Sequence, residues 1–196
     1  MWEKAEKFLA KDKYIGPIIK KHGPCKIEIS KNPDYFFDLV DSIVSQQLSG
    51  KAAATIFGRV KMGLGKITPD NILNTPDETF RGYGLSRQKT SYIKDLAART
   101  KSGELKIDKI EKLTDEEIKK ELIAVKGIGN WTAEMFLMFT LGREDIFPSD
   151  DLGINNGITK LLGRQLKSPE LDEFAIRWKP YRTVAAWYVW ASLDNR

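Results

Sequence analysis

Two adjacent acids, Asp150 and Asp151, follow Pro148 and precede a segment with the pattern of a helix start. Aspartate is favoured at a helix N-cap, so either side chain can serve only to begin that helix. Adjacent positions do not share a helix face, so the pair does not suit acid–base catalysis between two opposed carboxyl groups. A single carboxylate can instead stabilise a positive charge that develops in a transition state and orient a water molecule for attack.

About twenty residues earlier, Gly127 and Gly129 separate two segments of helical pattern. Glycine allows a tight turn and a close approach of the backbone to a ligand. The N–H groups at the start of the second helix, where the helix dipole favours an anion, can then hold a phosphate without reading base sequence. A plain helix–helix connection would use the same residues. The spacing between this turn and the acids favours the phosphate site.

Composition excludes several kinds of site. The chain has 196 residues and 41% hydrophobic residues, which fits one domain, or one domain with a small lobe. The single cysteine excludes an internal disulfide and a four-cysteine cluster. The single histidine, His22, excludes a metal site with several histidine ligands, and its place beside Gly23-Pro24 is typical of a turn residue rather than a catalyst. The net charge of +5 permits nucleic-acid binding without requiring it. No apolar run approaches the ~20 residues of a membrane span, and the charged start is unlike a signal peptide. We therefore expect a soluble, cytoplasmic protein.

Apolar residues recur at helical spacing along most of the chain, and only 26–30 alternates as a short extended segment would. The run 114–117 is a capping box that begins a helix. The segment 131–141 is almost wholly apolar, which predicts a buried, central helix. In the helix expected over 87–100, Arg87, Lys89 and Lys94 should face outward. The fold class is predicted to be all-α.

The residues Val-Lys-Gly-Ile-Gly-Asn-Trp-Thr-Ala at 125–133, followed by Asp-Leu-Gly-Ile at 151–154, resemble the helix-hairpin-helix-GPD superfamily of DNA glycosylases. The resemblance is closest to the DNA-3-methyladenine glycosylase II branch. It extends over most of the chain, through 43–53, Leu85-Ser86 with Lys89, and 177–182 with Trp190. It implies two helical lobes with an active-site cleft between them. We expect 36–105 and 106–165 to form the lobes, with 1–35 and 166–196 packed together.

The same resemblance assigns roles to individual residues. Asp151 matches the catalytic aspartate, which leaves Asp150 as its neighbour and the helix cap. Trp131 matches an aromatic residue that lines the base pocket, and Trp190 matches one that stacks on the extruded base. Met135 stands where an aromatic pocket residue would be expected. Without the resemblance, both tryptophans would be assigned to core packing.

The DNA-binding residues are also implied by the resemblance. Gln47, with Leu48 beside it, matches the wedge that fills the gap left in the duplex, and the sequence does not decide between the two. The hairpin would contribute Lys126, Gly127, Ile128, Gly129 and Thr132. The backbone of Ile123, Val125 and Ile128 matches a monovalent-cation site, in which Na⁺ or K⁺ would bridge carbonyls to a DNA phosphate. No other cofactor is expected.

These matches imply a monofunctional enzyme of base excision repair. Bifunctional lyases of the superfamily have a lysine in place of Trp131, so water should attack and leave an abasic site. The expected substrate is double-stranded DNA with alkylated purines such as 3-methyladenine or 7-methylguanine, bound by a monomer that is nucleoid-associated in a prokaryote. One alternative is the same fold acting on hypoxanthine or 8-oxoguanine. Another is a non-catalytic DNA-binding module, against which Asp151 and the tryptophans argue.

Overall fold

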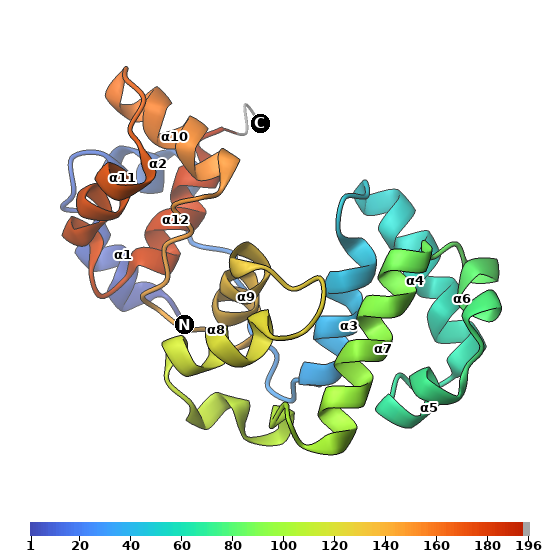
Figure 1. Cartoon of the computed structure of the whole chain (residues 1–196). Helices are drawn as coiled ribbons and strands as arrows, with labels where there is room; N and C mark the ends of the chain where they lie inside the picture. Colours follow the sequence, from blue (N-terminus) through green and yellow to red (C-terminus); the bar gives the residue numbers. More distant parts are fainter. Residues whose placement is uncertain (194–196) are drawn as a thin grey trace. The chain divides into compact units, whose positions relative to one another are not determined.

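The computed structural model describes residues 1–193, which form helices joined by turns and loops, with no strand in this range (Figure 1). The all-α prediction is confirmed. The segment 26–30, expected to be extended, pairs with no strand in the described chain. Instead, the carbonyl of Ile27 accepts a hydrogen bond from the indole nitrogen of Trp2 at 2.8 Å, and the Ile27 side chain is buried.

The chain forms two units. The terminal unit comprises 1–29 and the chain from Leu137 onward, and the central unit comprises 30–136. This division differs from the expected boundaries after 105 and 165. The segment 106–136 belongs to the central unit. Its 3-10 helix, Ile107–Lys112, packs on the helix Tyr35–Ser45, and its two α-helices, Asp115–Ile123 and Asn130–Met135, pack on each other.

The central unit is organised around two long helices that pack against each other, α3 and α7 (Figure 1). Hydroxyl or carboxylate side chains cap several helix starts; Asp34, Ser49 and Ser86 each accept the N–H three residues ahead. The helices of this unit are α3 (Tyr35–Ser45), α4 (Gly50–Leu64), α5 (Pro69–Asn74), α6 (Asp77–Tyr83), α7 (Arg87–Ser102), the 3-10 helix η1 (Ile107–Lys112), α8 (Asp115–Ile123) and α9 (Asn130–Met135).

The terminal unit packs around its last helix, which contacts the first two helices and the one that follows the acid pair. Arg182 holds the loop before that pair, because its Nε donates to Asp145 Oδ1 at 2.6 Å. Its helices are α1 (Glu3–Leu9), α2 (Ile15–His22), α10 (Leu152–Leu162), α11 (Ser168–Ala175), the 3-10 helix η3 (Ile176–Trp178) and α12 (Arg182–Ala191). None of the helices in the described residues is both long and apolar enough to cross a bilayer.

The segment expected as one buried helix over 131–141 differs from that prediction. It consists of α9 followed by a π-helical turn, η2 (Phe136–Thr140). Leu137 and Met138 are fully buried, but Trp131 is 47% exposed and Phe139 is 38% exposed. An apolar residue on an outward face has the same sequence signature as one in the core, so the pattern alone overstated the burial.

Candidate active site and DNA-binding loops

Asp151 is the N-cap of α10. Its Oδ1 accepts the backbone N–H of Ile154 at 2.8 Å and the indole Nε1–H of Trp190 at 2.8 Å. The expectation that Asp150 would be the cap is therefore wrong. The helix begins at Leu152, so the residue directly before it caps, while Asp150 accepts the hydroxyl of Ser168 at 2.9 Å. Two donors thus fix the orientation of the Asp151 carboxylate.

The residues around Asp151 explain the Asp-Leu-Gly-Ile motif. A Cβ at Gly153 would lie 2.8 Å from Cδ1 of Trp190 and 2.9 Å from Oδ1 of Asp151, so only glycine lets the indole reach the carboxylate. Asn155 Nδ2 donates to the carbonyls of Ser149 and Asp151, at 2.9 and 3.0 Å, and so holds the loop before the helix. The motif therefore shapes one rigid pair, a carboxylate and an indole.

Trp190 lies near the end of α12 and is partly exposed. Its ring is tilted by 34° against the ring of Phe139, with centroids 6.1 Å apart. Because the indole N–H donates to Asp151, the ring stays beside the carboxylate and is not enclosed in the core. The structure thus joins two of the predicted site residues, Asp151 and Trp190, in the terminal unit.

The other two expected pocket residues, Trp131 and Met135, lie in the central unit on α9. They are four residues apart, so their side chains share a face of the helix. Trp131 is 47% exposed and Met135 is partly exposed. The core-packing alternative does not hold for Trp131. About half of the indole surface, on the first turn of the helix, is open to solvent.

The hairpin between α8 and α9 needs only one of its two glycines for its own conformation. Gly127 has φ +81°, and a Cβ there would lie 2.0 Å from the Tyr92 ring. Gly129 has an ordinary φ of −97°, and a Cβ there would meet no atom within 4 Å. The open space beside Gly129 is where a ligand can approach the backbone. Ile128 donates its N–H to Val125 at 3.1 Å, inside the turn.

Side chains cap the first hairpin helix and join it to the second. The predicted capping box at the start of α8 is confirmed, with Thr114 and Glu117 bonded in both directions. Lys119 Nζ lies 2.7 Å from the buried carboxylate of Glu134, which also accepts Asn130 Nδ2 at 3.3 Å. Such a buried ion pair is satisfied rather than available for chemistry.

The wedge candidates lie on an exposed turn, residues 46–49, which we call the wedge loop. Gln47 has φ +57° and is the one non-glycine residue with a positive φ among the described residues. A conformation of this kind costs about 1–3 kcal/mol and persists only where its surroundings impose it. Gln47 is exposed and Leu48 is 37% exposed, so both side chains project from the loop.

Two contacts hold the wedge loop. Gln46 Nε2 donates to the carbonyl of Gly127 at 3.0 Å and lies 3.4 Å from the Thr132 hydroxyl. Thr132 is buried, so its side chain supports the hairpin from within. Lys89 Nζ donates to the carbonyls of Val44 and Gln46, at 2.7 and 2.6 Å. The prediction that Lys89 faces outward is therefore wrong.

The hairpin carbonyls named for a cation come from the end of α8 and the turn after it. The last carbonyls of a helix have no partner within the helix and lie at the negative end of its dipole. Val125 uses its carbonyl to accept Ile128 N–H, and Ile123 ends the helix. An all-oxygen donor set of this kind fits a hard monovalent cation. Among the described residues, no three His, Cys, Asp or Glu side chains gather as a metal site.

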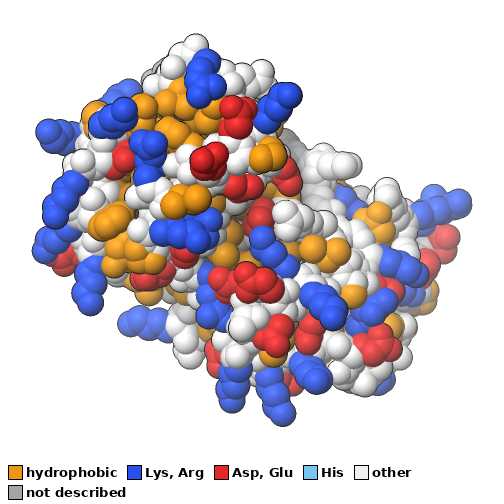
Figure 2. Space-filling view, turned by 60° about the vertical axis from the view of Figure 1, so that its left-hand side comes forward, with side chains coloured by type: hydrophobic (Ala, Val, Ile, Leu, Met, Phe, Trp, Pro, Cys, Tyr) orange, Lys and Arg blue, Asp and Glu red, His pale blue; other side chains and the backbone are white. Residues whose placement is uncertain are grey.

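Charges of both signs are mixed on one face of the molecule (Figure 2). On the face drawn in Figure 2, Lys and Arg side chains are interspersed with Asp and Glu. A scattered distribution provides modest electrostatic attraction to a polyanion without a single basic stripe.

The chain matches the model of the HhH-GPD superfamily of base excision DNA repair proteins over residues 40–181. It is 32% identical to the alkylbase DNA glycosidase-like protein mag2 of Schizosaccharomyces pombe, over 96% of this chain and 92% of that protein. It is 36% identical to DNA-3-methyladenine glycosylase 1 of the same yeast, over 91% of this chain and 80% of that protein.

Among solved structures, the chain is similar to the S. pombe 3-methyladenine DNA glycosylase Mag1 in complex with abasic DNA. The TM-score is 0.82 at 34% identity, and the alignment covers 95% of each chain. The family match spans both the wedge loop and the Asp151 helix start. This chain belongs to the HhH-GPD superfamily of base excision DNA repair proteins.

Proposed function

We propose that this chain is a monofunctional DNA glycosylase that releases alkylated purines, such as 3-methyladenine and 7-methylguanine, from double-stranded DNA. The observation that carries the proposal is the Asp151 carboxylate, held by two N–H donors and joined to the indole of Trp190. The names of the relatives, which are 3-methyladenine or alkylbase glycosylases, agree with this substrate class.

The proposed reaction needs no general acid to protonate the leaving base. An alkylated purine such as 7-methylguanine already carries a positive charge, so it leaves as a neutral base when the C1′–N bond breaks and the electron pair goes to the base. The sugar then carries the positive charge, which the fixed carboxylate stabilises. Water adds to C1′ and gives up one proton, and Asp151 can orient that water by accepting its hydrogen bond. The product is an abasic site in an intact strand.

The aromatic side chains suit a cationic base. A cation over an indole face gains about 0.5–2 kcal/mol, which a neutral undamaged base does not gain to the same extent. Trp190 and Trp131 each present a partly exposed indole, and Met135 adds a polarisable surface beside Trp131. We assign all three side chains to the recognition of the extruded base.

The central unit would bind the DNA. A base must leave the stack before C1′ can react, which costs a few kcal/mol. The exposed side chains of Gln47 or Leu48 would fill the gap and offset part of that cost. The backbone beside Gly129, together with Lys126, would approach a phosphate. A Na⁺ or K⁺ ion on the carbonyls of Ile123, Val125 and Ile128 would add a positive charge at that phosphate.

The hydrolytic course, without strand cleavage, follows from one substitution of residue type. Trp131 stands where the bifunctional lyases of the superfamily have a lysine, and an indole cannot form a Schiff base. Water is therefore the nucleophile in this proposal. Treatment with borohydride during the reaction should trap no covalent adduct between the protein and DNA.

The test is base release from methylated duplex DNA, with free bases separated by chromatography and strands separated by size. We expect free 3-methyladenine or 7-methylguanine, and strands that break only after hot alkali. Release of hypoxanthine or 8-oxoguanine instead would keep the enzyme class and overturn the substrate. No release from any of these duplexes, despite binding to DNA, would overturn the enzymatic proposal and favour a binding module.

A further inference from the structure

One side of α7 contacts the backbone of both DNA-binding loops. Lys89, Tyr92 and Asp95 are spaced three residues apart, so they lie along one side of the helix. The helix itself is 16 residues long and packs against α3, α5 and α6, which makes it a rigid support within the central unit (Figure 1).

Lys89 holds the wedge loop. Its ammonium group donates to the carbonyl of Val44, in the last turn of α3, and to that of Gln46, the residue after α3, which directly precedes the strained residue Gln47. Burial lowers the pKa of Lys89, since the ammonium group has left water to make these bonds. A cation at the carbonyl end of a helix also interacts favourably with its dipole. Lys89 thus fixes the point from which the wedge projects.

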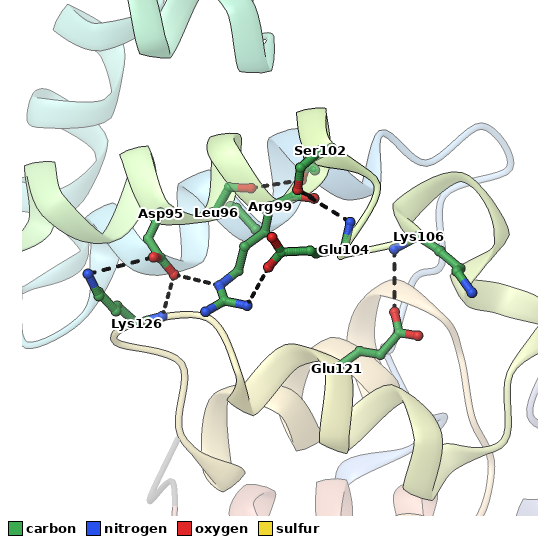
Figure 3. Close-up of polar contacts among 9 residues, drawn as sticks. Asp95, Leu96, Arg99, Ser102, Glu104, Lys106, Glu121 and Lys126 are labelled. Carbon is green, nitrogen blue, oxygen red and sulfur yellow. Dashed lines mark hydrogen bonds and ion pairs between the residues drawn. The ribbon is translucent and has the colours of Figure 1, made fainter.

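Asp95 holds the hairpin. Figure 3 shows its carboxylate between Lys126 and Arg99, where Oδ2 accepts the backbone N–H of Lys126 at 3.0 Å and Arg99 Nε at 3.0 Å. Burial would raise the pKa of Asp95, but the hydrogen bonds from Lys126 and Arg99 outweigh it and hold that pKa below its usual value. The side chain is only 16% exposed, so the carboxylate is a support and not a surface charge.

Tyr92 and Gln46 complete the connection. The Tyr92 ring lies directly against Gly127, between the two polar contacts of α7. Gln46 Nε2 binds the carbonyl of Gly127, so the wedge loop contacts the hairpin directly. The contacts form a closed ring that runs from Gln46 through Lys89, Asp95 and the hairpin and returns to Gln46.

We propose that Lys89 and Asp95 are positioning residues that hold the wedge loop and the hairpin as one DNA-gripping unit. A closed ring of contacts prevents either loop from moving alone, so wedge insertion and phosphate contact occur together. Loss of either the Lys89 or the Asp95 contact therefore impairs the wedge. The inference rests on the proposed function, because it concerns how that function's DNA-binding loops are aligned.

The first experiment compares Lys89→Met with Lys94→Met. Both variants remove one positive charge from α7, but Lys94 pairs with Asp77 and contacts neither loop. Affinities are measured for a duplex with a tetrahydrofuran abasic analogue, where a wedge can enter, and for an undamaged duplex. Lys89→Met should lower the ratio of the two affinities about tenfold, whereas Lys94→Met should leave it unchanged. Equal ratios in the two variants would overturn the proposal.

A second comparison tests whether the loops act together. Asp95→Ala should also lower the affinity ratio, although Asp95 contacts only the hairpin, and Asp95→Asn should restore part of it because its amide oxygen can still accept Lys126 N–H. The control is Asp70→Ala. Asp70 lies on α5 and forms an exposed ion pair with Lys101 of α7, so this variant removes an acidic partner of α7 that contacts neither loop. If Asp95→Ala weakens binding to both duplexes equally, the loops are independent and the proposal fails.

A double variant distinguishes this proposal from the proposed function. In a Leu48→Ala, Gln47→Ala background the wedge is absent, so adding Lys89→Met should change the affinity ratio by less than about twofold. A full additive loss would show that Lys89 acts by another route. Base release by the wild-type protein is measured in the same preparation. If it is absent, the proposed function fails, whereas release by the wild type with equal ratios for Lys89→Met and Lys94→Met overturns only the positioning roles.

Discussion

The terminal unit and the central unit hold their functional groups in different ways. In the terminal unit the candidate chemistry lies in two side chains, Asp151 and Trp190, which are bonded to each other. In the central unit the candidate DNA grip lies largely in backbone, in the turn at Gly127 and the strained turn at Gln47, each supported by side chains from α7. A catalytic site needs one group of the right type, whereas a grip on DNA needs a backbone of the right shape.

This difference separates the expected effects of substitutions. Changes at the carboxylate–indole pair should slow base release and leave DNA binding intact. Changes at the loops should weaken DNA binding and leave the intrinsic rate of bound substrate intact. Each prediction below can confirm or break that separation.

Gly127→Ala should have the largest effect among the loop variants. The added methyl would overlap the Tyr92 ring, and the residue would keep a positive φ, so the stability should fall by about 2–4 kcal/mol. Affinity for the abasic-analogue duplex should fall tenfold or more, since about 1.4 kcal/mol corresponds to a factor of ten. Thermal denaturation and fluorescence anisotropy measure the two effects. An unchanged free energy of unfolding would contradict the close contact between Gly127 and the Tyr92 ring.

Trp190→Phe should reduce the rate without reducing the affinity. Phenylalanine keeps an aromatic face but removes the N–H that binds Asp151, and a hydrogen bond to a charged group contributes about 1.5–3 kcal/mol. We expect single-turnover base release to slow about tenfold at saturating enzyme. Tighter or weaker binding by a similar factor, with an unchanged rate, would assign Trp190 to base stacking alone.

Leu48→Ala should have a smaller effect, confined to DNA with a gap in the stack. Leu48 is already 37% exposed, so its truncation should not unfold the protein, and the lost burial in the gap corresponds to about 1 kcal/mol. The affinity for the abasic analogue should fall about fivefold. Met62→Ala, at an 80% exposed position of α4, is the matched control. If both variants bind like the wild type, Leu48 is not the wedge, which leaves Gln47.

Gly129→Ala should change stability least, by less than about 0.5 kcal/mol, because φ is −97° and the added methyl would meet no atom. A loss of affinity in this variant would therefore come from a clash between the added methyl and the bound DNA, and not from a change in the fold. We expect the affinity for DNA to fall while the melting temperature stays unchanged. An unaffected affinity would show that no phosphate approaches this part of the hairpin.

The sequence predicts the helices and their caps better than the contacts that support the two loops of the central unit. Helical spacing and caps are local signals, so most helices and the Thr114 capping box could be predicted. Asp150 and Asp151 both satisfy the preference of an N-cap, and only the start of α10 at Leu152 decides between them. The contacts of Lys89 and Asp95 join residues more than thirty positions apart, so no local pattern reveals them.

The spacing of three residues along α7 is the one local signal that could have suggested this support. It was hidden because Lys and Asp on a helix usually face water, whereas here each binds the backbone of a loop distant in sequence. The two glycines of the hairpin also look alike in sequence. Their φ angles and surroundings separate them, since one is required by Tyr92 and the other faces open space.

The Asp151→Asn variant tests the division between the units most directly. Asparagine keeps an oxygen that can accept the N–H groups of Ile154 and Trp190, so the helix start and DNA binding should persist. The account predicts an affinity for abasic-analogue duplex within about twofold of the wild type, and base release slowed by at least about 100-fold. Asp150→Asn, whose side chain contacts Ser168, should release base normally. Base release at the wild-type rate by Asp151→Asn would contradict the assignment of the chemistry to this carboxylate.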